Sequence, residues 1–242
     1  MGWIAEGPGL IPYYEHAGIK LYHGDCREIL PEIEAEAIIT DPVWPNCEHI
    51  FPGIDAGSLL GQALSVARVR RAAIQLGCNS DPRFLACVPR HFPFLRTCYL
   101  EYAVIGYLGR IMRDAEVAFV FGDAPDSKPG ARVMPGRTIA TRCNGDKKWS
   151  NKARTPEIVA ASVATMKHPT QRLIQHVRWL CKWFGGASVI DPFMGSGTAA
   201  LACSGLGITF TGIELEERYC EIAAKRLSQE VFAFNEAAEV VE

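Results

Sequence analysis

The sequence of 242 residues predicts an α/β fold: a mainly parallel, twisted sheet with helices on both faces. Two observations predict this class. Short apolar runs typical of strands alternate with segments of helical periodicity. One of these runs also ends in a glycine-rich bend, DPFMGSGT at 191–198, which opens a helix of small residues. Such a strand–bend–helix unit is characteristic of nucleotide-binding sheets.

Elements of the first half are expected in the following order. Residues 19–22 (IKLY) predict a strand that turns into a helix near 26–32, and residues 36–40 (EAIIT) predict a strand that leads into Asp41. Apolar periodicity over 58–71 predicts a helix with arginines at its carboxyl end, where cations favour the helix dipole. Further strands are expected at 72–77, 98–107 and 116–121, and the last two could form a pair.

Regular periodicity is lost from Gly122 to about Thr165, where proline and glycine recur. A helix is expected at 170–184, with Thr170 as its cap. The remaining expected elements are a strand at 187–191, a helix at 198–206, a strand at 208–213 and a helix at 216–229. We therefore divide the chain into residues 1–123, an inserted region at 124–165, and residues 166–242.

Composition excludes several protein classes. A hydrophobic content of 48% and a charged content of 21% are those of an ordinary soluble domain. No apolar run reaches the ~20 residues of a membrane span, and the N-terminus lacks the pattern of a signal peptide. The nine cysteines are scattered without a C-x-x-C spacing. We expect a cytoplasmic protein with reduced thiols, no metal site and no membrane partner.

Charge is distributed unevenly along the chain. The segment 128–154 holds eight basic residues against Asp146 alone, a net charge of +7, which leaves −9 for the remainder because the total is −2. An acidic body with one basic segment suits a polyanionic partner. Residues of this segment expected to contact DNA are Arg132, Arg137, Arg142, Lys147, Lys148, Trp149, Lys152 and Arg154.

The bend at 191–198 predicts a site for a nucleoside cofactor. Gly195 and Gly197 allow the backbone to approach a ligand closely, and the helix that follows presents its positive end. Glu214 lies nineteen residues after Gly195, at the end of the next predicted strand, where a carboxylate can accept hydrogen bonds from ribose hydroxyls. The same spacing also fits a dinucleotide fingerprint, so these residues alone do not select the cofactor.

A second bend, Asp41-Pro42-Val43-Trp44, offers the groups needed to hold a planar base. The lone pair of an exocyclic amino group is delocalised into its ring. A carboxylate from Asp41 and the carbonyl of Pro42 could accept its N–H groups and favour an sp³ nitrogen, while Trp44 stacks on the flipped base. Cytosine C5 methylation would require a cysteine nucleophile in a Pro-Cys pair, which the sequence lacks.

Taken together, these segments resemble the DNA amino-methyltransferases that modify adenine N6 or cytosine N4. The motif order is similar to that of the permuted beta group, in which the catalytic motif precedes the cofactor motif. AIITDPVW resembles the catalytic motif, DPFMGSGT the glycine motif, and TGIELEERYCEIAAKRL the ribose-binding strand and helix. LYHGDCREIL resembles the segment before the catalytic strand, and KHPTQRL the HPTQKP helix start.

The resemblance implies a Rossmann-like methyltransferase fold with S-adenosylmethionine as cofactor, and assigns roles to matching residues. Val43 replaces the family's second proline, and Arg172 replaces the lysine of HPTQKP. The short inserted region implies a short target, weak specificity or a second subunit. The implied catalytic residues are Asp41, Pro42 and Trp44, and the implied cofactor-binding residues are Asp25, Lys167, His168, Thr170, Asp191, Phe193, Gly195, Gly197, Thr198 and Glu214.

The function that we predict is methyl transfer to adenine N6 of a flipped base in double-stranded DNA, as in restriction–modification. Asp41 favours adenine only as a family tendency. Three alternatives remain open: methylation of cytosine N4 or of RNA, a nicotinamide-dependent oxidoreductase that uses the same glycine bend, and a DNA-binding relative without activity because of Val43.

Overall fold

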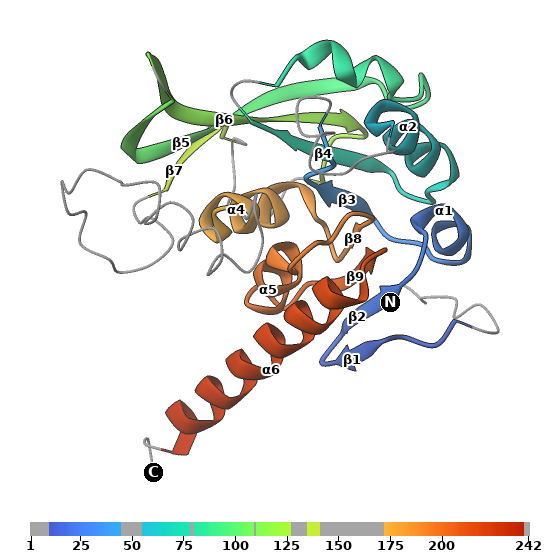
Figure 1. Cartoon of the computed structure of the whole chain (residues 1–242), viewed down its shortest axis with the longest axis vertical. Helices are drawn as coiled ribbons and strands as arrows, with labels where there is room; N and C mark the ends of the chain where they lie inside the picture. The colour runs from blue at the N-terminus through green and yellow to red at the C-terminus, as the bar shows by residue number, and fades with distance from the viewer. Residues whose placement is uncertain are drawn as a thin grey trace.

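A single mixed sheet forms the centre of the molecule (Figure 1). The computed structural model describes residues 10–44, 55–77, 80–108, 110–126, 135–140 and 172–239. Within these ranges the sheet has nine strands in the order β1-β2-β9-β8-β3-β4-β6-β5-β7. The strands are β1 (Tyr14–His16), β2 (Ile19–His23), β3 (Ala37–Thr40), β4 (Arg71–Leu76), β5 (Phe94–Leu108), β6 (Ile111–Gly122), β7 (Arg137–Ala140), β8 (Ser188–Asp191) and β9 (Thr209–Glu214).

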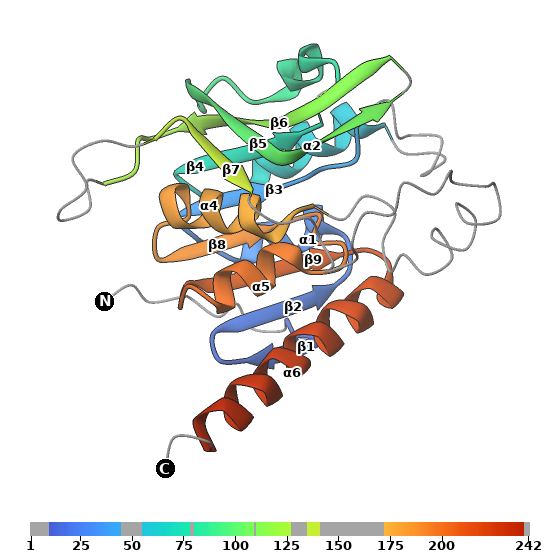
Figure 2. The same cartoon turned by 90° about the vertical axis from the view of Figure 1, so that its left-hand side faces the viewer.

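Helices cover both faces of this sheet (Figures 1 and 2). On one face α4, α5 and α6 pack on a core that includes Leu21, Ile39 and Phe210. On the other face α1 and α2 pack on a core that includes Ile38, Ile74 and Ile213. Neighbouring residues such as Ile38 and Ile39 point to opposite cores because side chains alternate along a strand. The helices are α1 (Cys26–Ile29), α2 (Ala56–Val66), α4 (Ile174–Phe184), α5 (Thr198–Ser204) and α6 (Glu217–Glu239), with 3₁₀ helices η1 (Leu30–Glu32) and η3 (Pro82–Cys87).

The central strands run parallel and come from both ends of the chain. β2 pairs with β9, β9 with β8, β8 with β3, and β3 with β4, all in parallel. The predicted α/β class with a mainly parallel centre is therefore confirmed. Because the carboxyl ends of parallel strands meet at one edge, the segments after β2, β3, β8 and β9 are brought together there.

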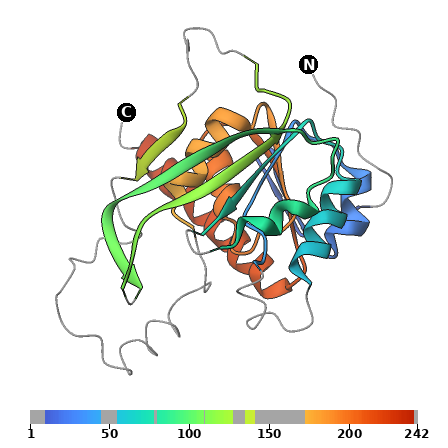
Figure 3. The same ribbon diagram turned by 90° about the horizontal axis from the view of Figure 1, so that it is seen from above.

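The antiparallel end of the sheet is longer than the sequence predicted. β5 and β6 form a hairpin that reaches away from the body (Figure 3), with register shifts between Phe94 and Arg96 and between Glu101 and Gly106. β7, which lies within the region 124–165, pairs in parallel with β5 and forms the edge of the sheet. Part of the region expected as an insert thus extends the sheet itself.

Three predicted boundaries need correction. The helix expected at 58–71 ends at Val66, since Ala67 is extended, and Arg71 starts β4 as a buried side chain. The Arg71 guanidinium donates to the Phe184 and Asp123 carbonyls, so this cation stabilises strand packing rather than a helix end. The helix expected from 170 begins at Ile174, with Leu173 at the N-cap position and without a side-chain cap. Lastly, α6 extends to Glu239, beyond the predicted limit of 229.

Three further findings concern thiols, membrane spans and metal ligands. In the part of the chain that the structure describes, the free thiols are those of Cys26, Cys87, Cys98, Cys181, Cys203 and Cys220. Among the described residues, no helix combines the length and apolar character of a bilayer span. Nor do the described ranges bring three or more His, Cys, Asp or Glu side chains together as a set that could hold a metal ion.

Candidate active site

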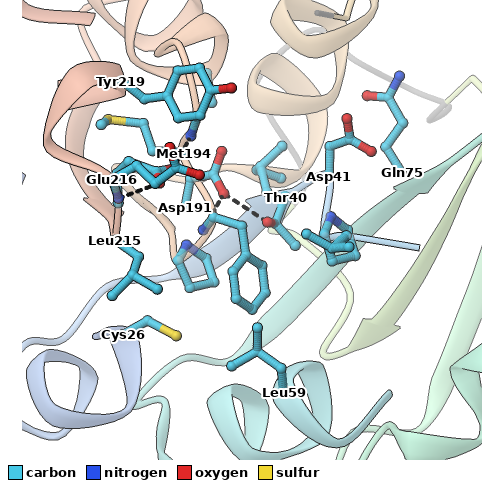
Figure 4. A pocket seen from close by; sticks show the side chains of 18 of the residues that line it. Cys26, Thr40, Asp41, Leu59, Gln75, Asp191, Met194, Leu215, Glu216 and Tyr219 are labelled. Atoms are coloured by element: carbon cyan, nitrogen blue, oxygen red, sulfur yellow. Dashed lines mark hydrogen bonds between the residues drawn. The ribbon is translucent and has the colours of Figure 1, made fainter. Parts of the chain in front are cut away.

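A cavity of about 370 Å³ opens at the carboxyl ends of the parallel strands (Figure 4). This volume lies in the range of small-molecule sites. Its walls come from strands β3 and β4, from the segments after β2, β3, β8 and β9, and from α1, α2, α4, α5 and α6. Predicted site residues that line it are Asp25, Asp41, Pro42, Trp44, Asp191, Phe193, Gly195, Thr198 and Glu214.

A hydrogen bond joins the two predicted bends. Thr40, the last residue of β3, donates from Oγ1 to Asp191 Oδ1 at 2.7 Å. The same carboxylate oxygen accepts the Phe193 backbone N–H at 3.1 Å. Burial raises the pKa of Asp191 to about 7, whereas the Thr40 hydrogen bond acts in the opposite direction. Asp191 therefore fixes the glycine bend to the strand that carries Asp41.

The glycine bend depends on backbone conformations that favour glycine. Gly195 and Gly197 have φ values of 54° and 79°, and α5 starts directly after Gly197. A Cβ on Gly197 would lie 2.7 Å from the Cβ of Ala223 in α6. The absence of a Cβ at Gly197 lets the bend pack on α6, while Gly195 and Thr198 line the cavity.

Glu214 closes the other side of the bend. Its carboxylate accepts the Gly195 N–H at 2.8 Å and the Glu216 N–H at 2.9 Å. Burial raises the pKa of Glu214. Each carboxylate oxygen can accept two hydrogen bonds, so both oxygens retain capacity for a ligand hydroxyl group. This geometry suits the predicted contact with ribose.

Asp25 lies at the end of β2, but its carboxylate is already engaged. It caps α1 by accepting the Arg27 backbone N–H at 2.9 Å, and it forms an ion pair with the Arg27 guanidinium. The hydrogen bonds from Arg27 lower the pKa of Asp25. Arg27 also donates to Gln62 in α2 at 3.1 Å. The first function of Asp25 in this structure is thus to position α1 and Arg27 at the cavity wall.

Asp41 forms a bidentate ion pair that the sequence did not predict. Arg172 donates from Nε to Asp41 Oδ2 at 2.5 Å and from Nη2 to Oδ1 at 2.7 Å. The third guanidinium nitrogen, Nη1, donates to Glu116 Oε1 at 2.6 Å. The side chains of Arg172 and Glu116 are 8% and 3% exposed, whereas that of Asp41 is 23% exposed. One buried cation is therefore shared by two carboxylates, and Asp41 is the one that lines the cavity.

Glu116 is held in turn by two neutral donors. Gln75 Nε2 and the Tyr102 hydroxyl group each donate to it at 2.5 Å. These residues lie on β4, β5 and β6, at the antiparallel side of the cavity. Because Gln75, Tyr102 and Arg172 all donate to the Glu116 carboxylate, the network holds Arg172 in one orientation.

Trp44 completes this side of the cavity. The Arg172 Cζ atom lies 4.0 Å from the centroid of its ring, within the range of a cation–π contact. A Cβ on Gly77, at the end of β4, would lie 2.7 Å from Cη2 and Cζ3 of the indole. The indole Nε1 is buried without a hydrogen-bond partner among the described residues. Trp44 is thus packed between the end of β4 and the Arg172 guanidinium.

The ionisation of Asp41 reflects two opposing effects. Burial raises the pKa of Asp41 to about 6, and the charge and hydrogen bonds of Arg172 lower it. Burial alone would lower the pKa of Arg172, but Asp41 and Glu116 raise it above its ordinary value. At neutral pH, the pair is consequently an arginine cation and an aspartate anion.

Sequence reasoning missed Gln75, Glu116 and Tyr102, and recognised Arg172 only as a charge-preserving replacement. Polar side chains within the apolar strands AAIQL and EVAFVF were the available signal, because buried polar groups usually have a defined partner. Of the residues predicted to bind DNA, Arg137 is described: it lies exposed on β7, with Nη1 3.6 Å from Glu101 Oε1. The following predicted site residues lie outside the residues that the structure describes: Arg132, Arg142, Lys147, Lys148, Trp149, Lys152, Arg154, Lys167, His168 and Thr170.

Comparison with known proteins identifies the family. The DNA methylase family model matches residues 94–225, more than half of the chain. The Type II methyltransferase M.ScaI of Streptomyces caespitosus is 35% identical over 90% of this chain and 84% of its own length. M2.DpnII of Streptococcus pneumoniae is 42% identical, but this match spans only 26% of this chain and 25% of the relative.

Solved structures share the fold. The M1.HpyAVI–SAM complex has a TM-score of 0.61 at 22% identity, covering 86% of this chain and 99% of that chain. The cytosine-N4-specific PvuII DNA methyltransferase has a TM-score of 0.59 at 14% identity, covering 89% and 88%. The family model and the relative matched along most of its length show that this chain belongs to the DNA methylase family of N6/N4 amino-methyltransferases.

Proposed function

We propose that this chain transfers a methyl group from S-adenosylmethionine to the N6 amino group of an adenine flipped out of double-stranded DNA. The observation that carries the proposal is the shared cavity. Asp41 and the glycine bend after β8 line the same hollow, and Thr40 and Asp191 connect them directly. This shared lining supports a site in which an amino-group acceptor and a cofactor bend act together.

The cofactor side of the cavity fits an adenosyl group with a charged amino-acid tail. Glu214 offers its carboxylate to the ribose hydroxyls, and Cys26, Leu59, Phe193 and Leu215 supply apolar surface for a purine (Figure 4 labels three of them). When bound, S-adenosylmethionine supplies an electrophilic methyl carbon on a sulfonium ion. The residues of the bend need only hold it with that carbon directed toward Asp41.

Asp41 and Pro42 act on the amino group. Hydrogen bonds from the amino group to the Asp41 carboxylate and the Pro42 carbonyl withdraw the nitrogen lone pair from the ring and direct it toward the methyl carbon. As the nitrogen–carbon bond forms and the carbon–sulfur bond breaks, positive charge develops on nitrogen. The Asp41 anion stabilises this charge, and the excess proton leaves toward the carboxylate or solvent. Trp44 provides the plate on which the base stacks.

The basic segment 128–154 is proposed to contact the DNA phosphates. Arg137 shows how one of its cations is placed, on the exposed edge of the sheet beside the β5–β6 hairpin. Phosphate contacts would dominate the affinity, which should fall steeply as salt concentration rises.

Adenine is favoured over cytosine N4 by Asp41 alone, as a tendency of the family. Membership of the DNA methylase family argues against the oxidoreductase alternative. Val43, at the position of the usual second proline, lines the cavity and leaves the carboxylate and carbonyl acceptors of the bend in place. This arrangement supports an active enzyme rather than a non-catalytic relative.

Methyl transfer can be tested with the full chain, tritiated S-adenosylmethionine and genomic DNA that lacks methylation. The DNA is then digested, and its nucleosides are separated by mass. N6-methyldeoxyadenosine is the expected product. N4-methyldeoxycytidine would move the target to cytosine, and DNA without label would contradict the proposed function. Single-molecule sequencing of the same DNA would give the recognised bases.

A further inference from the structure

Arg172 makes the two contacts that the proposed function requires of a target base. Its guanidinium is planar, lies 4.0 Å from the centroid of the Trp44 ring, and donates two N–H groups to the Asp41 carboxylate. A flipped adenine or cytosine would likewise present a flat face to Trp44 and amino N–H groups to Asp41. Trp44, Asp41 and Arg172 all line the same cavity.

These contacts compete with a base for space and for hydrogen bonds. The bidentate pair places one Arg172 N–H on each Asp41 oxygen, and the guanidinium lies where the amino group of a base would donate. A guanidinium carbon 4.0 Å from the ring centroid also occupies that face of Trp44, where a stacked base would need to lie at a similar distance. Gly77 packs against the six-membered ring of the Trp44 indole, and this contact restricts movement of the indole.

We propose that Arg172 is a placeholder for the target base, a proposal that rests on the proposed function. The Arg172 guanidinium closes the base site until an entering nucleotide displaces it from Asp41 and Trp44. Glu116 is a second anionic partner for Arg172 and makes displacement of the guanidinium from Asp41 feasible. It binds the third nitrogen of Arg172 and is fixed by Gln75 and Tyr102, so the cation keeps one buried anion after it leaves Asp41. Lysine at this position could neutralise Asp41 but would lack the planar fork that imitates a base.

The placeholder keeps Asp41 and Trp44 closed to free nucleotides. If the open form is about a tenth of the population, the apparent affinity for a base falls about tenfold. Removing the guanidinium while preserving the charge of the site should restore that affinity. The trio of Asp41, Glu116 and Arg172 has a net charge of −1, and the double variant Arg172→Met with Glu116→Gln has the same charge.

Nucleotide binding to the full chain tests this inference without requiring methyl transfer or the recognised sequence. The probes are dAMP and dCMP, with dIMP and dUMP as matched ligands in which a carbonyl replaces the amino group. Dissociation constants are measured by ligand-observed NMR with S-adenosylhomocysteine present. We expect the double variant to bind dAMP or dCMP about tenfold more tightly than the wild type. Glu116→Gln alone, which retains Arg172, should show no such gain.

The outcomes separate the placeholder from the proposed function. Unchanged or weaker binding in the double variant, or an equal gain for dIMP and dUMP, would overturn the placeholder. With either of these binding results, DNA methylation by the wild type would mean that only the placeholder proposal fails. Absence of DNA methylation would mean that both proposals fail. A gain without DNA methylation would keep the placeholder and reject methyl transfer. If the double variant does not fold, Arg172→Lys replaces it in the same test. This variant retains a cation beside both carboxylates, and we expect a smaller gain in nucleotide affinity.

Discussion

The two sides of the cavity are built in different ways. On the cofactor side, backbone groups dominate: the Gly195 and Glu216 N–H groups bind Glu214, and Gly197 packs on Ala223. On the base side, charged side chains from distant segments dominate, with Arg172 between Asp41 and Glu116. One side is held by local backbone conformation, and the other by ion pairs between side chains that are distant in sequence. The proposals of a preformed cofactor site and of a base site closed by Arg172 both rest on this difference.

Replacing Asp41 by Ala should separate the two sides most strongly. We expect methyl transfer to fall by about 10²- to 10³-fold, the range associated with losing one preorganised group that stabilises transition-state charge. Cofactor affinity should be retained, because Glu214 and the glycine bend do not depend on Asp41. Tritium transfer and calorimetric titration with S-adenosylmethionine measure the two effects. Near-normal turnover in this variant would remove Asp41 from the mechanism.

Replacing Gly197 by Ala should damage the cofactor side and spare the ion network. The new Cβ combines a positive φ of 79° with a 2.7 Å approach to Ala223, so unfolding free energy should fall by about 1–3 kcal/mol. Cofactor affinity should fall with it, as the bend shifts. Gly207→Ala is the matched control, since Gly207 has a φ of 66° with no atom within 4 Å of the added Cβ. Equal losses in the two variants would show that backbone strain alone is responsible.

Replacing Gly77 by Ala should impair the base side by a smaller amount. The added Cβ would meet the Trp44 indole at 2.7 Å and displace the stacking plate. We expect kcat/KM for DNA to fall about tenfold, comparable with the loss of one base–aromatic stack, at unchanged cofactor affinity. Steady-state kinetics and calorimetry test this. Weaker binding of S-adenosylmethionine by this variant would show that Trp44 also positions residues on the cofactor side of the cavity.

The smallest predicted effect is a dependence of activity on pH. The pKa of Asp41 is about 6, and its anion is the form that accepts the amino hydrogens. Turnover should therefore fall to half of its plateau near pH 6 and decline further below it. Because Arg172 lowers this pKa, Arg172→Met should move the midpoint to higher pH. A pH profile that remains flat from 5 to 8 would exclude Asp41 as the titrating group.

The strands and the glycine bend on the cofactor side could be predicted from the sequence because their signals are local. Alternation of strands and helices predicted the parallel centre, and the expected shared site of Asp41 and Asp191 follows from β3 and β8 being neighbours. Gly197 was assigned to ligand binding, but its Cβ position faces α6, a contact between residues 26 positions apart that no local pattern reveals.

The base side was predicted only in part because its partners are distant in sequence. Arg172 is 131 residues from Asp41 and 56 from Glu116, and Gln75 is 41 from Glu116. Nothing in DPVW indicates that its carboxylate is paired with an arginine. Helix ends were also misjudged where tertiary packing prevailed over periodicity, as at Arg71, whose burial in β4 overrode an apparent helical pattern.

A crystal structure of this chain with S-adenosylmethionine, or with an unreactive analogue, would show whether the bend after β8 and Asp41 serve one reaction. We expect the ribose beside Glu214 and the methyl group directed toward Asp41, so that an amino nitrogen bound there would lie about 3–3.5 Å from the methyl carbon. A cofactor bound outside this cavity, or one whose methyl group points away from Asp41, would contradict it.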